Sequence, residues 1–260
     1  MSKAIPPYVE GHDLLLGKTV LVTAAAGTGI GFAVAKRCLE EGATVMLSDV
    51  HERRLGESVE MLERECGTRP ASHPCNVAVE DDVRGLARAA LSELGHIDVL
   101  MNNAGLGGTT AIVDMTDEQW YAVIDVTLTG TFRMTRAVLP HMMERGSGVI
   151  VNNASVLGWR AQAGQAHYAA AKAGVMAFTR CAAVEAAESG VRVNAVSPSL
   201  ATHKYLTKVM SRELLDELTA REAFGRGAAP WEVANVMVFL ASDYSSYMTG
   251  EVVSVSSQHP

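Results

Sequence analysis

The chain has 260 residues, 48% of them hydrophobic, and a formal net charge of -7 at pH 7. This length predicts one domain with a full core, and the apolar fraction excludes a disordered chain. No basic tract is present, which argues against a nucleic-acid partner. The four cysteines lack metal-site spacing, and no apolar run approaches the roughly 18 residues that span a bilayer. We therefore expect no metal, no membrane partner and a cytoplasmic protein.

The chain begins with a segment unlike the rest. Residues 1–16 include Pro6 and Pro7, which disfavour helix and central strand, and predict an extended N-terminal arm. From residue 17 onward, short apolar runs rich in β-branched residues alternate with longer stretches of helical spacing. The runs expected to form strands are residues 18–25, 43–49, 71–75, 97–102, 148–155, 191–197 and 251–256.

This alternation is typical of a parallel sheet covered on both faces. It predicts a single Rossmann-type, doubly wound α/β domain over residues 17–260, with about seven parallel strands and helices on both faces. The segment 203–229 is longer than an ordinary connection and has helical spacing in its middle. We expect it to form a small helical lid over the substrate.

A glycine-rich stretch, TAAAGTGIG, follows the first predicted strand. Gly27, Gly29 and Gly31 lie where that strand leads into a helix expected to begin near Ile30. Their backbone N–H groups can therefore approach a pyrophosphate. Such glycines also serve ordinary strand-to-helix turns, so the loop alone leaves both interpretations open.

The end of the second predicted strand favours the dinucleotide interpretation. Asp49 lies there, about 20 residues after the glycines, where a carboxylate can accept both ribose hydroxyls and repel the 2′-phosphate of NADP. NAD is therefore the expected cofactor. Arg53 and Arg54 follow and could attract that phosphate, which keeps NADP as the lesser alternative, although charges on a helix surface explain them as well.

A third group of residues could carry chemistry. Tyr168 and Lys172 are four residues apart in an alanine-rich stretch expected to be helical, so both project from one face. A nearby ammonium favours the phenolate, and lowering the pKa of tyrosine from about 10 makes it a usable general base. Ser155, at the end of a predicted strand, could hold the substrate oxygen by a hydrogen bond.

From about Gly17 to Thr249, the chain resembles the short-chain dehydrogenase/reductase family. The resemblance rests on TAAAGTGIG, Asp49, NNAG, Ser155, YAAAK, VRVNAVSP and FLASDYSSYMTGE, in the family's order and spacing. It implies that Tyr168 is the acid/base, that Lys172 lowers its pKa and binds the nicotinamide ribose, and that Ser155 orients the reacting oxygen. It also implies a homotetramer, or a homodimer, with an interface on the helices around 117–144 and 165–189.

The resemblance extends to a set of cofactor-binding positions. In this chain they are Gly27, Thr28, Gly29, Ile30, Gly31, Asp49, Asn76, Val77, Asn103, Ala104, Gly105, Tyr168, Lys172, Pro198 and Leu200.

The chain departs from the family pattern at several positions. The first glycine of the loop is missing, and the turn is one residue longer, with alanines at 24–26. Asn76 stands where the family has Asp, and still offers an amide oxygen. Thr127 stands where the fourth catalytic residue, an Asn, is expected, so a proton relay through it is an open question. His203 takes the place of a threonine near the nicotinamide.

Longer stretches carry a narrower resemblance: VTAAAGTGIG, NNASVLGWRAQ, AHYAAAKAGVMAFTRC, AFGR with PWEVA, and ASDYSSYMTGEVVSVSSQHP. In these stretches the chain resembles a subgroup of bacterial steroid-catabolic enzymes acting on a hydroxy-hydrindane acyl-CoA. They imply NAD-dependent interconversion of a secondary ring alcohol and ketone on a bicyclic CoA thioester. Trp159, Arg160 and His203 are the candidate substrate residues, since an apolar ring with a phosphorylated tail favours aromatic and cationic contacts. The alternatives are a 3-oxoacyl thioester reductase, a general alcohol dehydrogenase and a non-catalytic dinucleotide sensor.

Overall fold

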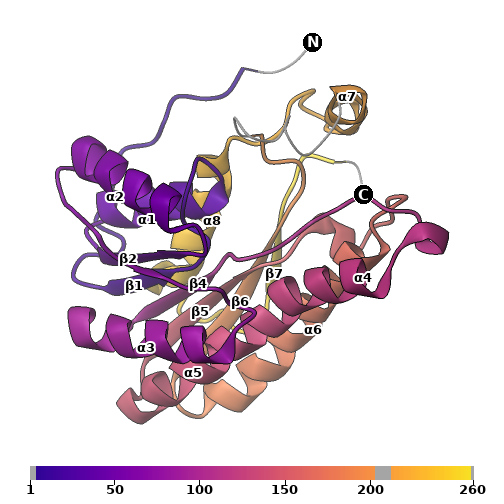
Figure 1. The fold of residues 1–260 in the computed structure, drawn as a ribbon. Coiled ribbons are helices and arrows are strands. Elements are labelled where there is room, and N and C mark those ends of the chain that lie inside the picture. Colours follow the sequence, from indigo (N-terminus) through magenta and orange to yellow (C-terminus); the bar gives the residue numbers. More distant parts are fainter. Residues whose placement is uncertain (1–3, 203–211, 259–260) are drawn as a thin grey trace.

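A computed structural model describes residues 4–202 and 212–258 of the chain. Within these residues, seven parallel strands form one sheet in the order β3-β2-β1-β4-β5-β6-β7 (Figure 1). All seven predicted strands are confirmed, and so is the doubly wound fold. The strands are β1 (Thr19–Val22), β2 (Thr44–Asp49), β3 (Ala71–Pro74), β4 (Val99–Asn102), β5 (Gly148–Asn153), β6 (Val191–Pro198) and β7 (Val252–Val255).

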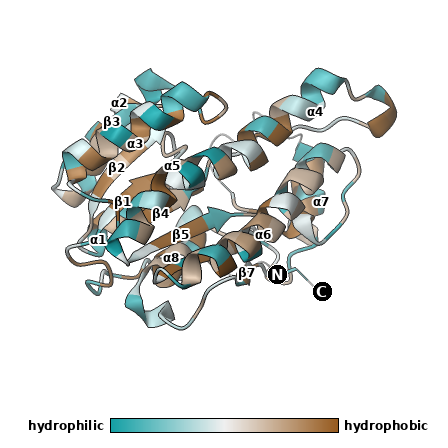
Figure 2. Ribbon diagram, turned by 90° about the horizontal axis from the view of Figure 1, so that it is seen from below, coloured by the Kyte–Doolittle hydropathy of each residue, from teal (hydrophilic) through white to brown (hydrophobic). Residues whose placement is uncertain are grey.

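Helices cover both faces of the sheet. Figure 2 shows apolar strands in the interior and hydrophilic residues on the outer sides of the helices. Because neighbouring residues of a strand point to opposite faces, Val20 packs with one helical layer, formed by α1, α2 and α8, and Leu21 with the other, formed by α3, α5 and α6. The helices are α1 (Ile30–Glu40), α2 (Glu52–Cys66), α3 (Glu80–Leu94), α4 (Asp117–Ile124), α5 (Gly130–Arg145), α6 (Ala166–Ala187), α7 (Arg212–Ala220) and α8 (Pro230–Ala241).

The order of the strands creates a crevice at one edge of the sheet. β1 is central, with Val20 paired to Val45 of β2 on one side and to Val99 of β4 on the other. The loops that leave β1 and β4 at their carboxyl ends therefore diverge toward opposite halves of the sheet. Ligands of open α/β sheets bind at such a point.

The chain before β1 lies against the helices. Residues 4–13 form neither helix nor strand. The Tyr8 hydroxyl donates to Glu40, its ring stacks edge-on against Trp231 of α8, and the buried Arg37 of α1 donates to the Val9 carbonyl. Arg37 also pairs with the buried Glu41. These contacts anchor the segment to α1 and α8.

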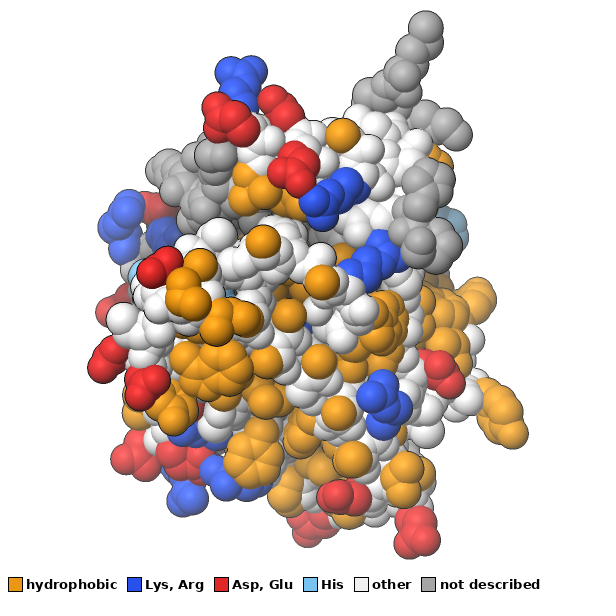
Figure 3. All heavy atoms as spheres, turned by 90° about the vertical axis from the view of Figure 1, so that its right-hand side faces the viewer, with side chains coloured by type: hydrophobic (Ala, Val, Ile, Leu, Met, Phe, Trp, Pro, Cys, Tyr) orange, Lys and Arg blue, Asp and Glu red, His pale blue; other side chains and the backbone are white. Residues whose placement is uncertain are grey.

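The helices α4 to α6 present apolar side chains to the outside. α4 continues through a five-residue π-helical turn, Asp125–Thr129, into α5. Tyr121, Phe132 and Val184 of α4, α5 and α6 are exposed, and Figure 3, which views this side of the molecule, shows a broad gathering of apolar side chains. None of the helices in the described parts of the chain is both long enough and apolar enough to cross a membrane.

Candidate active site

One cavity of about 520 Å³ opens at the carboxyl edge of the sheet. Asn103, Ser155, Leu200 and Gln258, which follow the ends of β4, β5, β6 and β7, all line it. The parallel strands thus bring residues that are far apart in sequence to one place. Other lining residues are Ile30, Gly105, Leu106, Leu157, Gln162, Gln165, Tyr168, Lys172, Ser199 and Leu218.

The glycine loop has the shape of a phosphate site. α1 begins at Ile30, as predicted, and Gly29 caps it without a side-chain hydrogen bond, so N–H groups of the first turn remain available. A Cβ on Gly31 would lie 2.2 Å from the Ala24 carbonyl oxygen, so only glycine allows this close approach. The buried Thr28 hydroxyl has no partner in the described protein. An unpaired buried polar atom beside these N–H groups fits a ligand rich in hydrogen-bond acceptors.

The lengthened turn is held by Asp49. The backbone N–H of Ala26 donates to Asp49 Oδ2 at 3.1 Å, and that of His51 donates to Oδ1 at 2.9 Å. The N–H of Gly27 is directed to Ser58 of α2, at 3.0 Å, and not into the crevice. Burial raises the pKa of Asp49, although the backbone at Ala26, the charge of Arg54 and the backbone at Val50 oppose the rise. The turn therefore keeps its shape through the same carboxylate that was predicted to bind the ribose.

Ala24 occupies the position of the lost glycine. Its φ is +50°, in the left-handed region that favours glycine. Asn103 stabilises this strained residue, because its Nδ2 donates to the carbonyl oxygens of Thr23 and Ala24 at 3.2 and 3.0 Å. Asn103 Oδ1 in turn accepts from Asn153 Nδ2 at 2.9 Å. Asn103 thus joins the loop after β1 to the ends of β4 and β5.

A shallow hollow follows β3 on the other side of Asp49. Asn76 lines it, and its Oδ1 already accepts from the Ala78 N–H at 3.0 Å, so one lone pair remains for a ligand. Val77 is buried, and a Cβ on Gly130 would lie 2.7 Å from its Cγ2. Its side chain therefore packs α5 against this loop, and only its backbone is available to a cofactor.

The three predicted catalytic side chains meet at the cavity. Tyr168 and Lys172 lie one turn apart on α6, with Lys172 Nζ 5.5 Å from the centre of the Tyr168 ring. Lys172 is buried and donates to the Asn153 carbonyl oxygen at 2.5 Å. Ser155 is buried beside them at the start of a short helical turn, where its Oγ accepts from the Leu157 N–H at 3.2 Å.

Burial displaces the pKa values of two residues of this group. Burial raises the pKa of Tyr168, and a hydrogen bond with Ser155 opposes that rise only in part. Burial also lowers the pKa of Lys172 to about 8. The low-dielectric surroundings thus oppose the charged form of both residues.

Thr127 holds a loop. It is fully buried in the π-helical turn, where its Oγ1 accepts from the Leu106 N–H at 3.0 Å and donates to the Leu106 carbonyl at 3.2 Å. Its own carbonyl accepts from the Thr131 hydroxyl at 2.9 Å. The hydroxyl proton of Thr127 is therefore already used. The threonine shapes the backbone after β4, at Gly105 and Leu106, which line the cavity.

The predicted substrate residues are less central. Trp159 is 52% exposed, and neither it nor Arg160 lines the cavity; Arg160 instead donates to Gln258. His203 lies outside the described residues. Pro198 is buried at the end of β6. Gln162, Gln165 and Gln258 also line the cavity and were not predicted from the sequence. Gln258 carried a usable signal, because it closely follows a predicted parallel strand and thus had to lie near the same edge.

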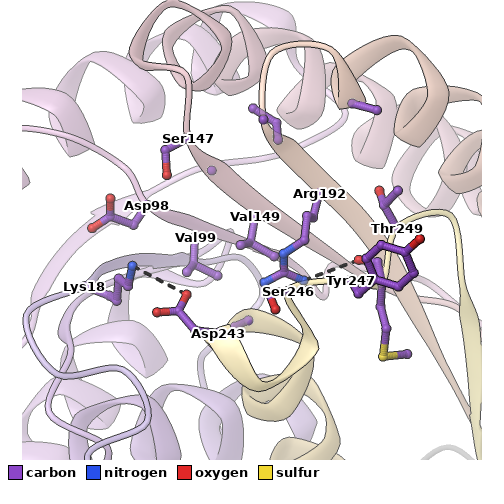
Figure 4. Close-up of a pocket in the computed structure, with 16 residues that line it drawn as sticks. Lys18, Asp98, Val99, Ser147, Val149, Arg192, Asp243, Ser246, Tyr247 and Thr249 are labelled. Atoms are coloured by element: carbon purple, nitrogen blue, oxygen red, sulfur yellow. Dashed lines mark hydrogen bonds and ion pairs between the residues drawn. The ribbon is translucent and has the colours of Figure 1, made fainter.

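A second hollow lies at the amino edge of the sheet (Figure 4). The Arg192 guanidinium there donates to the carbonyl oxygens of Leu240 and Ser242, both at 3.0 Å. Lys18 pairs with Asp243 at 4.0 Å. These charges already have protein partners, so we assign them to the fold. The described residues include no group of side chains suited to a metal ion.

Comparisons with known proteins cover nearly the whole chain. A family model described as enoyl-(acyl carrier protein) reductase matches residues 24–257. A Mycobacterium tuberculosis protein named (5R,7aS)-5-hydroxy-7a-methyl-1-oxo-2,3,5,6,7,7a-hexahydro-1H-indene-carboxyl-CoA reductase is 60% identical over 98% of both chains. The Thermotoga maritima 3-oxoacyl-acyl-carrier-protein reductase FabG is 39% identical over 93% of this chain and 97% of its own. A crystal structure of a short chain dehydrogenase from Mycobacterium smegmatis, 56% identical, covers 99% of both chains with a TM-score of 0.88.

Proposed function

Because this chain belongs to the short-chain dehydrogenase/reductase family and is an NAD(P)-dependent oxidoreductase, we propose a specific reaction for it. It interconverts a secondary ring alcohol and its ketone on a bicyclic, steroid-derived acyl-CoA, with NAD as cofactor. One observation carries this proposal. Ser155, Tyr168 and Lys172 meet at the cavity of a chain that is 60% identical to a reductase named for a hydroxy-hydrindane CoA substrate.

The dinucleotide would lie across the carboxyl edge between β1 and β4. Gly29 and Thr28 would hold the pyrophosphate, because the loop offers free N–H groups and an unpaired hydroxyl. Asp49 would accept the adenosine ribose hydroxyls, and Lys172 would donate to the nicotinamide ribose. When bound, the nicotinamide supplies the hydride acceptor or donor.

The protein supplies the proton chemistry. Tyr168 takes the hydroxyl proton of the alcohol, or returns it to the ketone oxygen, and Ser155 holds the same oxygen by a hydrogen bond. The Lys172 ammonium lies 5.5 Å from the centre of the Tyr168 ring, and its positive charge would favour the phenolate against the effect of burial.

The cavity suits a compact ring. Its volume of about 520 Å³ lies within the range of small-molecule sites. Leu106, Leu157, Leu200 and Leu218 provide apolar walls, while glutamine side chains provide a few polar contacts. We place the rings there, and the CoA tail near Trp159 and Arg160 outside it. Leu218 belongs to α7, which fits the predicted lid.

The cofactor preference can be tested at Asp49. We expect Asp49→Ala to raise the kcat/KM ratio of NADPH to NADH by about tenfold, because the repulsion of a 2′-phosphate is lost. Asp49→Asn is the matched variant, since it removes the charge and keeps an acceptor for Ala26. An unchanged ratio in both variants would refute NAD selection by this carboxylate.

The exposed apolar side chains of α4 to α6 fit subunit contacts. We propose a homotetramer, or a homodimer, that buries Tyr121, Phe132 and Val184. Sedimentation of the wild type and of Val184→Glu tests it, because a buried glutamate would dissociate the assembly. The four unpaired cysteines fit our proposal of a cytoplasmic protein.

The decisive experiment offers the purified protein NAD with steroid-derived ring alcohols, both as free acids and as CoA thioesters, and follows NADH absorbance. We expect turnover of the ring thioester, and turnover of none of the ring alcohols would refute the proposed substrate. A 3-oxoacyl thioester with NADPH tests the second candidate, which the FabG relative favours. Tight NADH binding without oxidation of any alcohol would favour a non-catalytic sensor.

A further inference from the structure

A buried carboxylate lies next to the cavity but outside the catalytic group. Glu222 follows α7 and is 4% exposed. Its Oε2 accepts from the Ser257 hydroxyl at 2.8 Å, and its Oε1 accepts from Gln258 Nε2 at 3.0 Å and from the Leu200 N–H at 3.4 Å. One side chain therefore joins the chain after α7, the loop after β6 and the segment after β7.

The backbone reinforces this junction. Glu222 and Gln258 form an isolated antiparallel bridge, and the Ala223 N–H donates to the Ser257 carbonyl at 2.8 Å. Residues 257 and 258, which follow β7, thus pair with the chain after α7.

Gln258 is held from its other side as well. Arg160 Nη1, from the loop that follows Ser155, donates to Gln258 Oε1 at 2.5 Å. The guanidinium can only donate, and both carboxyl oxygens of Glu222 accept hydrogen bonds, so the amide between them has a single favourable orientation. Gln258 lines the cavity with Tyr168 and Ser155. Its position there is therefore determined by two charged groups.

We propose that Arg160, Gln258 and Glu222 form a hydrogen-bonded chain that holds the C-terminal segment as a wall of the catalytic cavity, and that Gln258 determines specificity for bulky ring substrates. Glu222 and Arg160 are positioning residues, because they act through Gln258. A second wall is fixed in a similar way, since Gln165 Nε2 donates to the Gly108 carbonyl at 2.7 Å and to Thr109 Oγ1 at 2.9 Å. A rigid ring gains most from two walls that do not move.

The test exchanges the amide and the carboxylate. Gln258→Glu leaves two carboxylates facing one another and Arg160, whereas Glu222→Gln leaves two amides, which can still form a hydrogen bond but no longer have the charge that favours one orientation of Gln258. The double variant Glu222→Gln/Gln258→Glu again pairs an amide with a carboxylate, and also gives Arg160 an anionic partner. Two readouts are measured for each protein. The first is kcat and KM for the ring CoA thioester, which rests on the proposed function. The second is hydrogen exchange of the peptide spanning residues 252–260.

We expect each single variant to raise KM for the ring thioester about tenfold and to speed exchange in that peptide, with NADH affinity within about twofold of wild type. The double variant should recover most of both losses, since the effects of contacting groups are not additive. Asp98→Asn is the matched control, because it alters a partly buried carboxylate at the opposite edge. It should leave KM unchanged, and any faster exchange should affect the core strands alike and not this peptide in particular.

Single variants with wild-type KM and wild-type exchange would overturn the proposal. A double variant whose losses equal the summed losses of the two single variants would overturn it as well. If Glu222→Gln unfolds the protein, Gln258→Glu is compared with the wild type alone, and unchanged KM and exchange in that variant would overturn the proposal in the same way. If the wild type does not turn over the ring thioester, the proposed function fails by itself, and hydrogen exchange still decides whether the chain of hydrogen bonds exists.

Discussion

The two edges of the sheet use polar side chains in opposite ways. At the amino edge, Asp98 accepts from the Thr19 backbone and hydroxyl and from Arg145, and Arg192 donates to several acceptors. At the carboxyl edge, the buried Thr28 hydroxyl has no partner among residues 4–202 and 212–258, and within the same ranges the buried Lys172 ammonium donates to the Asn153 carbonyl group. A saturated buried group stabilises the fold, whereas an unsaturated one has capacity for a ligand.

This contrast explains why, of two hollows of similar size, one is assigned to the fold and the other to a ligand. Each edge collects the ends of the parallel strands, and each has a cavity of about 500 to 600 Å³. Size therefore does not identify the site. The unused hydrogen-bonding capacity does, together with titratable groups whose pKa values burial displaces.

Replacement of Tyr168 by phenylalanine should abolish most of the catalytic activity at the carboxyl edge. We expect Tyr168→Phe to lower kcat about 10³-fold, because the proton donor and acceptor is lost, with NADH affinity changed only a few-fold. Steady-state rates and NADH fluorescence titration measure the two effects. Near-normal turnover would mean that another group moves the proton.

At the amino edge, the same type of experiment should affect stability alone. Asp98→Asn should lower the free energy of unfolding by about 2 kcal/mol, since charge-assisted hydrogen bonds are weakened. Although burial alone would raise the pKa of Asp98, hydrogen bonds from Thr19 and Arg145 hold it below its ordinary value. Its contribution is therefore present at neutral pH and lost as pH falls through the folded pKa. Urea unfolding measures the loss of stability. A large fall in kcat would contradict the prediction that the amino edge contributes to stability alone.

At the carboxyl edge, the buried charge of Lys172 should lower the free energy of unfolding at neutral pH. Its pKa is about 8 in the folded protein and 10.5 ordinarily, so the unfolded chain binds more protons between these values. Stability should therefore rise with pH in that window, by about 2 kcal/mol from pH 7.5 to 9.5. We expect this rise in the wild type relative to Lys172→Met, measured by urea unfolding at both pH values. Parallel curves would show that the ammonium is not buried.

The smallest expected effect concerns the strained loop at the carboxyl edge. Ala24→Gly should stabilise the protein by up to about 1 kcal/mol, because Ala24 has a φ of +50°. Ala25→Gly is the matched control: Ala25 is fully buried and outside the left-handed region, so it should destabilise. Thermal unfolding compares the two. Equal destabilisation would show that the alanine at 24 contributes packing that outweighs its strain.

Much of the fold could be predicted because its signals are local. A strand buried on both faces needs a continuous apolar run, so all seven strands were visible as short segments, and the start of α1 near Ile30 followed from the glycines before it. Tyr168 and Lys172 could be placed together because helical spacing alone sets their separation.

Other features of the site depend on neighbours that spacing does not reveal. The raised pKa of Tyr168 results from burial by many segments, and the hydroxyl of Thr127 is engaged by a backbone 21 residues away. Glu222 and Gln258 meet because the chain after β7 returns beside the chain after α7. No local pattern encodes that pairing.

The sequence by itself determined the doubly wound sheet and placed Ser155, Tyr168 and Lys172 at its carboxyl edge, because local periodicity and parallel topology suffice for these. Only the tertiary structure decided which polar groups are saturated. It assigned Asp49 to hold the longer turn, Thr127 to hold a loop, and Gln258 to a cavity wall. Hydrogen-bond partners and burial are sums over distant segments, and these exist only once the chain has folded.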